Sequence, residues 1–225
     1  MPAETESQHR TCVWAKDLPD DEFERVRKSL TERRYPKGGY ICHRGDRLDY
    51  WTGVASGLIK MSAVSLDGKA MTFAGIGKGA WFGEGSLLKD EPRKYDLVAL
   101  RDTTLILMGK QAFRWLSDNS AAFNRFLVRQ LNERMGLFIA TIEQDRILDP
   151  KARVARNIAW LCNPVLYPEI GRKIEISQEE LALLAGLSRA VVNKALQALG
   201  DEGLIRCEHG LILVGDVEKL GDYGA

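Results

Sequence analysis

The sequence predicts an α+β protein made of an N-terminal antiparallel β-roll, a long helix and a C-terminal winged helix-turn-helix. Eleven of its 21 glycines fall within residues 36–90, where they separate short apolar runs as turns separate strands. From Asn119 to Leu148 the chain has no proline and a single glycine, which is typical of one long helix. A third segment, residues 176–196, carries the capping and turn residues of two short helices that meet at a corner.

The predicted roll covers residues 35–110. Its apolar runs, such as 57–61, are short and are bounded by glycine, and Asp67-Gly68 is a dipeptide that favours a hairpin turn. A short charged helix over residues 20–31 precedes the roll, after a Leu-Pro break. Antiparallel pairing of consecutive short strands accounts for this pattern.

One glycine-rich stretch of the roll, residues 75–80, matches the G-x-G-x-x-A pattern of dinucleotide-binding proteins by letter. That motif has to lie between a strand and a helix, whereas here further glycines follow at once. We therefore interpret the glycines of this stretch as turn residues. No nucleophile with a neighbouring base and no paired carboxylates stand out, so we expect a protein that is not an enzyme.

The composition indicates a soluble globular chain. Hydrophobic residues make up 45%, and 32 Lys and Arg nearly balance 31 Asp and Glu, which excludes a strongly basic coat and an acidic disordered chain. The sequence has no apolar run of about 18 residues and no export signal, so we expect a cytoplasmic protein without membrane contact. Four scattered cysteines and three scattered histidines form no C-x-x-C pair, so we expect no metal site.

The long helix carries one apolar stripe. Thirty residues at the α-helical rise span about 45 Å, which is more than a roll of this size can cover. We therefore favour a two-stranded coiled-coil dimer interface, with lengthwise packing on the chain's own roll as the alternative. The stripe residues recur at spacings of three or four: Phe123, Leu127, Leu131, Met135, Phe138 and Ile142.

Asp149-Pro150 ends this helix, because proline disfavours helical geometry in the residue before it. We take this dipeptide as a domain boundary and hinge. The expected units are a sensor domain over residues 1–118, a dimerisation helix and hinge over 119–149, and a winged helix-turn-helix domain over 150–225.

The helix-turn-helix has a complete set of local signals. Ser177 and Glu180 have the S-x-x-E spacing of a capping box, which starts the first helix. Gly186 supplies the glycine of a tight corner, and Ser188 is a good N-cap for the second helix. Two apolar runs then follow, separated by Glu-His-Gly, and they are expected to form a β-hairpin wing.

The second of these helices is expected to enter the DNA major groove. Once the core-facing positions are removed, Arg189, Ala190, Asn193 and Lys194 remain on its outer face, and residues 188–199 contain two basic and no acidic residues. Residues 150–225 as a whole carry nine Lys and Arg against ten Asp and Glu, so DNA affinity would depend on local charge and on two copies acting together. The alternative is that the helix-turn-helix is a docking surface for another protein.

Roll, long helix and winged helix-turn-helix together resemble the Crp/Fnr family of bacterial transcription regulators. The resemblance covers residues 14–214, and its marks include Pro36-Lys37-Gly38, Phe82-Gly83-Glu84 and Leu148-Asp149. It implies a homodimer that binds double-stranded DNA at a palindromic operator, with RNA polymerase as a further partner.

The resemblance also implies which residues meet DNA. Arg189 matches a position that reads a guanine, where its two-pronged donor geometry fits O6 and N7, and Lys194 would meet a base or a phosphate. Ala190 stands where the family carries a base-reading Glu, so the commonest half-site of the family is not assumed. The expected DNA-contacting residues are Ser177, Gln178, Ser188, Arg189, Ala190, Asn193, Lys194 and His209.

In cyclic-nucleotide-binding members of the family, a Gly-Glu pair and a later Arg hold the phosphate and the ribose. Two positions depart from that pattern: Lys94 replaces a small hydroxyl residue, and Phe138-Ile139 replace the Thr-Ser pair that reads adenine. The expected effector is therefore cAMP or another small anion, with an ancestral, empty pocket as the alternative. No iron-sulfur cluster is expected, since only Cys12 lies near the N-terminus. The candidate effector residues are Gly83, Glu84, Gly85, Ser86, Arg93, Lys94 and Thr141.

Overall fold

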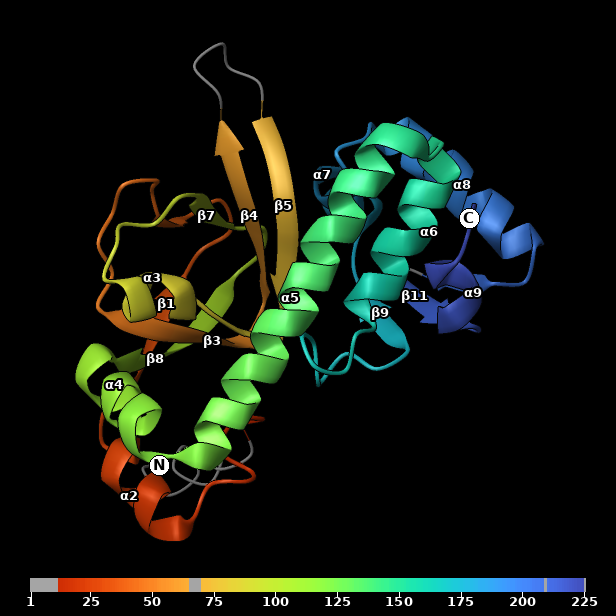
Figure 1. Ribbon diagram of the computed structural model, residues 1–225. Coiled ribbons are helices and arrows are strands. Elements are labelled where there is room, and N and C mark those ends of the chain that lie inside the picture. The colour runs from red at the N-terminus through yellow and green to blue at the C-terminus, as the bar shows by residue number, and fades with distance from the viewer. Residues whose placement is uncertain (1–11, 65–69, 209, 225) are drawn as a thin grey trace.

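The computed structural model describes residues 12–64, 70–208 and 210–224, and it confirms the predicted α+β fold (Figure 1). The Asp67-Gly68 turn and His209 lie outside the described residues. Within the described ranges no helix is long and apolar enough to cross a membrane, and no three His, Cys, Asp or Glu side chains are grouped so as to hold a metal.

The roll consists of two four-stranded antiparallel sheets, in the orders β1-β8-β3-β6 and β2-β7-β4-β5. Short strands joined by glycine-containing turns produce this arrangement, as the sequence predicted. A short helix, α3 (Glu84–Lys89), follows β6. The strands are β1 (Leu30–Tyr35), β2 (Tyr40–Cys42), β3 (Tyr50–Ser56), β4 (Leu58–Val64), β5 (Ala70–Gly77), β6 (Trp81–Phe82), β7 (Asp96–Ala99) and β8 (Thr103–Gly109).

The first strand begins earlier than predicted. The charged helix α2 spans Asp20–Arg27 and not 20–31, because Leu30 and Thr31 pair with Met108 and Leu107 of β8. Six ladder positions between β1 and β8 therefore override the local helical preference of the charged segment.

The glycines of residues 75–80 were interpreted as turn residues, and for two of them this is wrong. Gly75 and Gly77 lie inside β5, opposite Lys60 and Leu58 of β4. Only Gly79, with a φ of 81°, sits in the turn that leads to β6. The strand ladder continues through these glycines because nothing in their backbone conformation interrupts it.

An aromatic cluster fills the end of the roll nearest the N-terminus. Trp51 lies at its centre, with its ring centroid 4.4 Å from that of Trp81 and 5.3 Å from that of Phe123. Trp14, from the segment before α2, closes the cluster against both tryptophans. Gly53 permits this packing, since a Cβ there would lie 2.4 Å from the Trp81 ring.

Two helices follow the roll, whereas the sequence analysis expected a single helix that starts at residue 119. Helix α4 spans Lys110–Asn119 and the long helix α5 spans Ala121–Ile147. The two are separated at Ser120, which is extended, fully buried, and accepts a hydrogen bond from Phe123 N at 3.1 Å. The long helix therefore starts two residues later than predicted, at a serine that acts as its cap.

The apolar stripe of α5 divides into two parts. Phe123 and Leu127 are buried in the aromatic core of their own roll, so their assignment to a dimer interface is wrong. Three predicted stripe residues, Leu131, Met135 and Ile142, are exposed, and they are joined by Val128 and Ile139, which the sequence analysis did not include. Phe138 is half-buried and faces a small internal cavity.

The C-terminal domain contains the predicted winged helix-turn-helix, together with one strand and one short helix that were not predicted. Asp149 caps its first helix by accepting from Ala152 N, with Pro150 at the first helical position. The additional strand pairs with the wing to give a sheet in the order β10-β11-β9. The elements are α6 (Pro150–Leu161), β9 (Lys173–Glu175), α7 (Gln178–Ala185), α8 (Arg189–Asp201), β10 (Ile205–Glu208), β11 (Leu211–Val214) and α9 (Val217–Gly221).

The position of Phe123 leads to a stability prediction. Phe123→Ala should lower the free energy of unfolding by about 3–5 kcal/mol, because it removes a fully buried ring from a packed aromatic cluster. The matched control is Leu88→Ala, whose side chain is exposed on α3 and whose loss should cost under about 1 kcal/mol. Urea unfolding measures both, and equal effects would contradict the assignment of Phe123 to the core.

Candidate nucleic-acid interface and effector pocket

The first helix of the helix-turn-helix starts with the predicted capping box. Ser177 Oγ accepts from Glu180 N at 3.2 Å, and Glu180 Oε2 accepts from Ser177 N at 2.8 Å. Arg101, on the loop between β7 and β8, binds the same carboxylate with two nitrogens at 2.7 and 2.8 Å. Burial opposes ionisation of this carboxyl, yet the hydrogen bonds from Ser177 and Arg101 outweigh it and lower the pKa of Glu180.

The turn between the two helices depends on a glycine. Gly186 has a φ of 63° and donates its N–H to Ala182 O, which ends α7 in the left-handed conformation that glycine tolerates. Ser188 then caps α8 by accepting from Val191 N at 3.3 Å. These two residues set the angle at which α8 leaves the corner.

Helix α8 presents a polar face to solvent. Val192, Ala195 and Leu196 are buried against the rest of the domain, and the four predicted residues on the opposite face are exposed. Gln178 Nε2 donates to Asn193 Oδ1 at 3.2 Å and so links the two helices of the motif. The exposed face is formed by Arg189, Ala190, Asn193 and Lys194, together with Val191 and Gln197.

Val191 and Gln197 were not among the residues predicted from sequence. Gln197 lies one helical turn after Asn193, so an extension of the same spacing would have found it. A shallow groove beside this face separates α8 from the wing, and it includes Arg189, Ser177 and the exposed thiol of Cys207.

The second candidate site lies where β6 meets α3. Gly83 caps α3 with a φ of 96°, and a Cβ at this position would lie 2.3 Å from Arg93 Nη2. The Arg93 guanidinium therefore lies directly against the backbone at the start of α3. Only glycine allows the guanidinium to lie this close to the backbone, which explains why a glycine precedes Glu84.

Arg93 is 1% exposed, although it carries a full positive charge. Its Nη1 donates to Tyr95 Oη at 3.2 Å and its Nη2 donates to Tyr50 O at 3.3 Å, while its Nε has no partner. No carboxylate forms an ion pair with it within the described residues. A buried guanidinium is costly without an anion, so this site fits an anionic group that accepts several hydrogen bonds.

Glu84 lies beside this cation and is 2% exposed. Its Oε1 accepts from Arg134 Nη1 of α5 at 2.7 Å, and Arg134 Nη2 donates to Trp81 O at 2.8 Å. The other carboxylate oxygen, Oε2, has no partner and is able to accept from a hydroxyl group.

Sequence reasoning did not identify Tyr95 or Arg134 as parts of this site. Burial raises the pKa of Tyr95, so its hydroxyl remains protonated at neutral pH. Arg134 lies one turn before Phe138 on α5, and nothing in the sequence singles it out, because Arg125, Arg129 and Glu133 are charged on the same helix.

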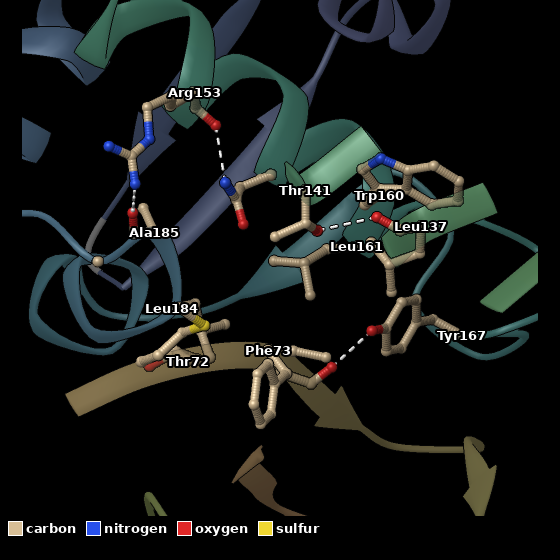
Figure 2. A pocket seen from close by; sticks show the side chains of 15 residues that line it. Thr72, Phe73, Leu137, Thr141, Arg153, Trp160, Leu161, Tyr167, Leu184 and Ala185 are labelled. Atoms are coloured by element: carbon tan, nitrogen blue, oxygen red, sulfur yellow. Dashed lines mark hydrogen bonds between the residues drawn. The ribbon is translucent and has the colours of Figure 1, made fainter. Parts of the chain in front are cut away.

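Two predicted effector residues do not join the others. Lys94 is exposed and its Nζ pairs with Glu91 at 3.0 Å, away from Arg93. Thr141 Oγ1 donates to Leu137 O at 2.8 Å and lines a different cavity of about 310 Å³, between β5, α5, α6 and α7 (Figure 2). Gly85 and Ser86 lie half-buried in the first turn of α3, beside Glu84.

Known proteins resemble the chain over both parts. Residues 32–120 match the family model of the Cyclic nucleotide-binding domain, and residues 152–223 match that of the Crp-like helix-turn-helix domain. The Cyclic AMP receptor protein of Thermus thermophilus is 31% identical over 210 residues, which cover 90% of this chain and 92% of the relative. The CRP-like cAMP-activated global transcriptional regulator of Mycobacterium tuberculosis is 28% identical over 197 residues, covering 86% and 88% of the two chains.

A solved structure shows the same fold over most of the chain. FixK2 from Bradyrhizobium japonicum superposes with a TM-score of 0.70 at 18% identity, over 87% of this chain and 98% of that one. The Crp-like match favours DNA binding by the helix-turn-helix over the alternative of a protein-docking surface. The chain belongs to the Crp/Fnr family of DNA-binding transcription regulators.

Proposed function

We propose that the protein is a homodimeric regulator that binds a palindromic operator under the control of cAMP. The observation that carries the effector assignment is the buried Arg93 guanidinium, which has a free Nε and no carboxylate partner among the described residues. The names of the relatives, a cyclic AMP receptor and a cAMP-activated regulator, support this choice of anion.

Each part of a cyclic nucleotide has a complementary group at this site. Arg93 would bind the phosphate, assisted by the backbone N–H groups of Gly85 and Ser86 at the start of α3. The free oxygen of Glu84 would accept from the ribose 2′-hydroxyl. The base would face Phe138 of α5, an apolar contact in place of a hydroxyl pair, so recognition of adenine by hydrogen bonds is weaker on this side.

On DNA, each α8 would enter one major groove of a two-fold symmetric site, with half-sites about 34–36 Å apart. Arg189 would read guanine, while Asn193 and Lys194 would meet bases or phosphates. Ser177, Gln178, Ser188 and His209 would hold the DNA backbone. The Gln178–Asn193 hydrogen bond fixes the side chain of Asn193 before DNA arrives.

The exposed stripe of α5 supports dimerisation. Val128 is 67% exposed and Ile139 is 61% exposed, which leaves a continuous apolar seam along the helix. Pairing of two such helices would remove it from water. Through the dimer, effector binding at α5 would alter the angle between the two DNA-binding domains at Asp149-Pro150.

As in the family, RNA polymerase in the cytoplasm would be the further partner.

The effector assignment predicts the effect of removing Arg93. Arg93→Ala should weaken cAMP binding by roughly 30-fold or more, since the phosphate loses a buried, hydrogen-bonded partner. Lys94→Ala is the matched control and should leave the affinity unchanged, because Lys94 is exposed and pairs with Glu91. Isothermal calorimetry measures both, and equal losses in the two variants would rule out the assignment.

Base reading is tested by selection from randomised duplex DNA. Arg189→Ala should lose the preference for one guanine in each half-site, at a cost of about 1–3 kcal/mol. Arg25→Ala, on an exposed face of α2, is the control and should keep the wild-type sequence preference. An unchanged preference in the Arg189→Ala selection would disprove its role.

Dimerisation is tested by sedimentation equilibrium. Ile139→Asp should raise the dimer dissociation constant by roughly 100-fold or more, since it places an unpaired charge in an apolar interface. Leu88→Asp introduces the same charge at an exposed position on α3 and should leave the dimer intact. A dimer that survives Ile139→Asp would show that the seam of α5 is not the interface.

A further inference from the structure

The C-terminal domain packs against the roll of its own chain along the glycine-rich end of β5. Gly75, Gly77 and Gly79 occupy alternate positions, and each meets a side chain of the C-terminal domain. A Cβ on Gly75 would lie 2.5 Å from Leu184 Cδ1, one on Gly77 3.1 Å from Ile170 Cδ1, and one on Gly79 2.9 Å from Glu169 Cγ.

Backbone conformation does not require glycine at two of these positions. Only Gly79 has a positive φ, whereas Gly75 and Gly77 have ordinary strand geometry. Their missing side chains are therefore explained by the close approach of the C-terminal domain. The contact is reinforced by an ion pair between Lys78 Nζ and Glu169 Oε2 at 3.0 Å and by the two-pronged Arg101–Glu180 pair.

Tyr167 lies at the centre of this contact. It follows α6, is 5% exposed, and its Oη donates to Gly75 O at 2.5 Å across the domain boundary (Figure 2). Burial raises the pKa of Tyr167 to about 12, so the hydroxyl remains a donor at neutral pH. Its neighbour Leu166 is also buried, in the same apolar cluster as the core of the roll.

Tyr167 and Leu166 also lie against α5 beside Arg134, the residue that binds Glu84 of the candidate effector site. Together with Arg134 and Phe138 they line a cavity of only about 20 Å³, which has room for about one water molecule. The same Arg134 holds Glu84 at 2.7 Å, so this cavity adjoins the Gly83–Arg93 site. A cavity of this volume has no room for a purine base between Phe138 and the Tyr167 ring.

We propose that Tyr167 is a built-in plug of the effector pocket, whose ring and the base of a cyclic nucleotide exclude each other. Ligand binding then displaces Tyr167 and releases the C-terminal domain from β5. This inference rests on the proposed function, because it takes the ligand to be a cyclic nucleotide held by Arg93. If cAMP binds only to molecules in which Tyr167 has left the pocket, the measured dissociation constant for cAMP equals the intrinsic one divided by the fraction of such molecules.

The test is a calorimetric titration of the full-length protein with cAMP, in wild type and in two Tyr167 variants. Tyr167→Ala removes the ring and should bind cAMP more than tenfold tighter than wild type. Tyr167→Phe keeps the ring but loses the hydrogen bond to Gly75 O, and should tighten binding by about two- to tenfold.

The outcomes separate this inference from the proposed function. If Arg93→Ala abolishes cAMP binding while Tyr167→Ala binds no tighter than wild type, the effector assignment stands and the plug is wrong. If cAMP binds to Tyr167→Ala but gives no heat with wild type, the result would support a plug that is closed in nearly all wild-type molecules. No heat from either protein would overturn both.

A second variant tests the same contact without removing a buried ring. Gly75→Ala would collide with Leu184, so it should loosen the C-terminal domain, speed hydrogen exchange in residues 165–171 and tighten cAMP binding. Gly109→Ala is the matched control, since its added Cβ meets nothing within 4 Å. Faster exchange without tighter cAMP binding would show that docking and ligand binding are independent, contrary to the proposal.

Discussion

A single helix, α5, has to satisfy three different surroundings along its length, and the rest of the structure depends on how it does so. Its first turns carry Phe123 into the aromatic core of the roll. Its middle directs Arg134 at the buried carboxylate of Glu84 and turns Met135 to solvent. The next residue, Gly136, faces α6, where a Cβ added to it would lie 3.7 Å from the Trp160 ring. Any rotation of α5 about its axis would disturb all three contacts together, which couples the pocket, the seam and the C-terminal domain.

The chemistry of the effector pocket follows from buried charges that are only partly neutralised. Arg93 has two hydrogen bonds and no carboxylate among the described residues, whereas Glu84 shares its charge with Arg134 and keeps one oxygen free. Such groups are expensive to bury when they are unpaired. The roll tolerates this cost beside Gly83, where the free donor of Arg93 and the free acceptor of Glu84 are complementary to an anion bearing a hydroxyl group.

The fold and the helix-turn-helix could be predicted from sequence because their signals are local. Ser177, Gly186 and Ser188 act within one turn of the backbone, and the structure places each where spacing required. Predictions failed where a distant partner decides the outcome. Phe123 and Leu127 fit a dimer stripe by spacing, yet aromatic rings from the roll cover them. The glycines of β5 were predicted to lie in turns, because nothing near them in sequence reveals the domain that packs against them.

Ala190 lies on the exposed face of α8 that we propose reads DNA, and its side chain is the shortest of the predicted base-reading residues there. A methyl group offers a base pair only apolar contact, so it distinguishes a thymine methyl from other groups but supplies no hydrogen bond. Each half-site would therefore convey less information than one read by three long polar side chains. More sequences in a genome compete for a regulator of this kind, and its selectivity depends correspondingly on the spacing of two half-sites and on the shape of the DNA between them.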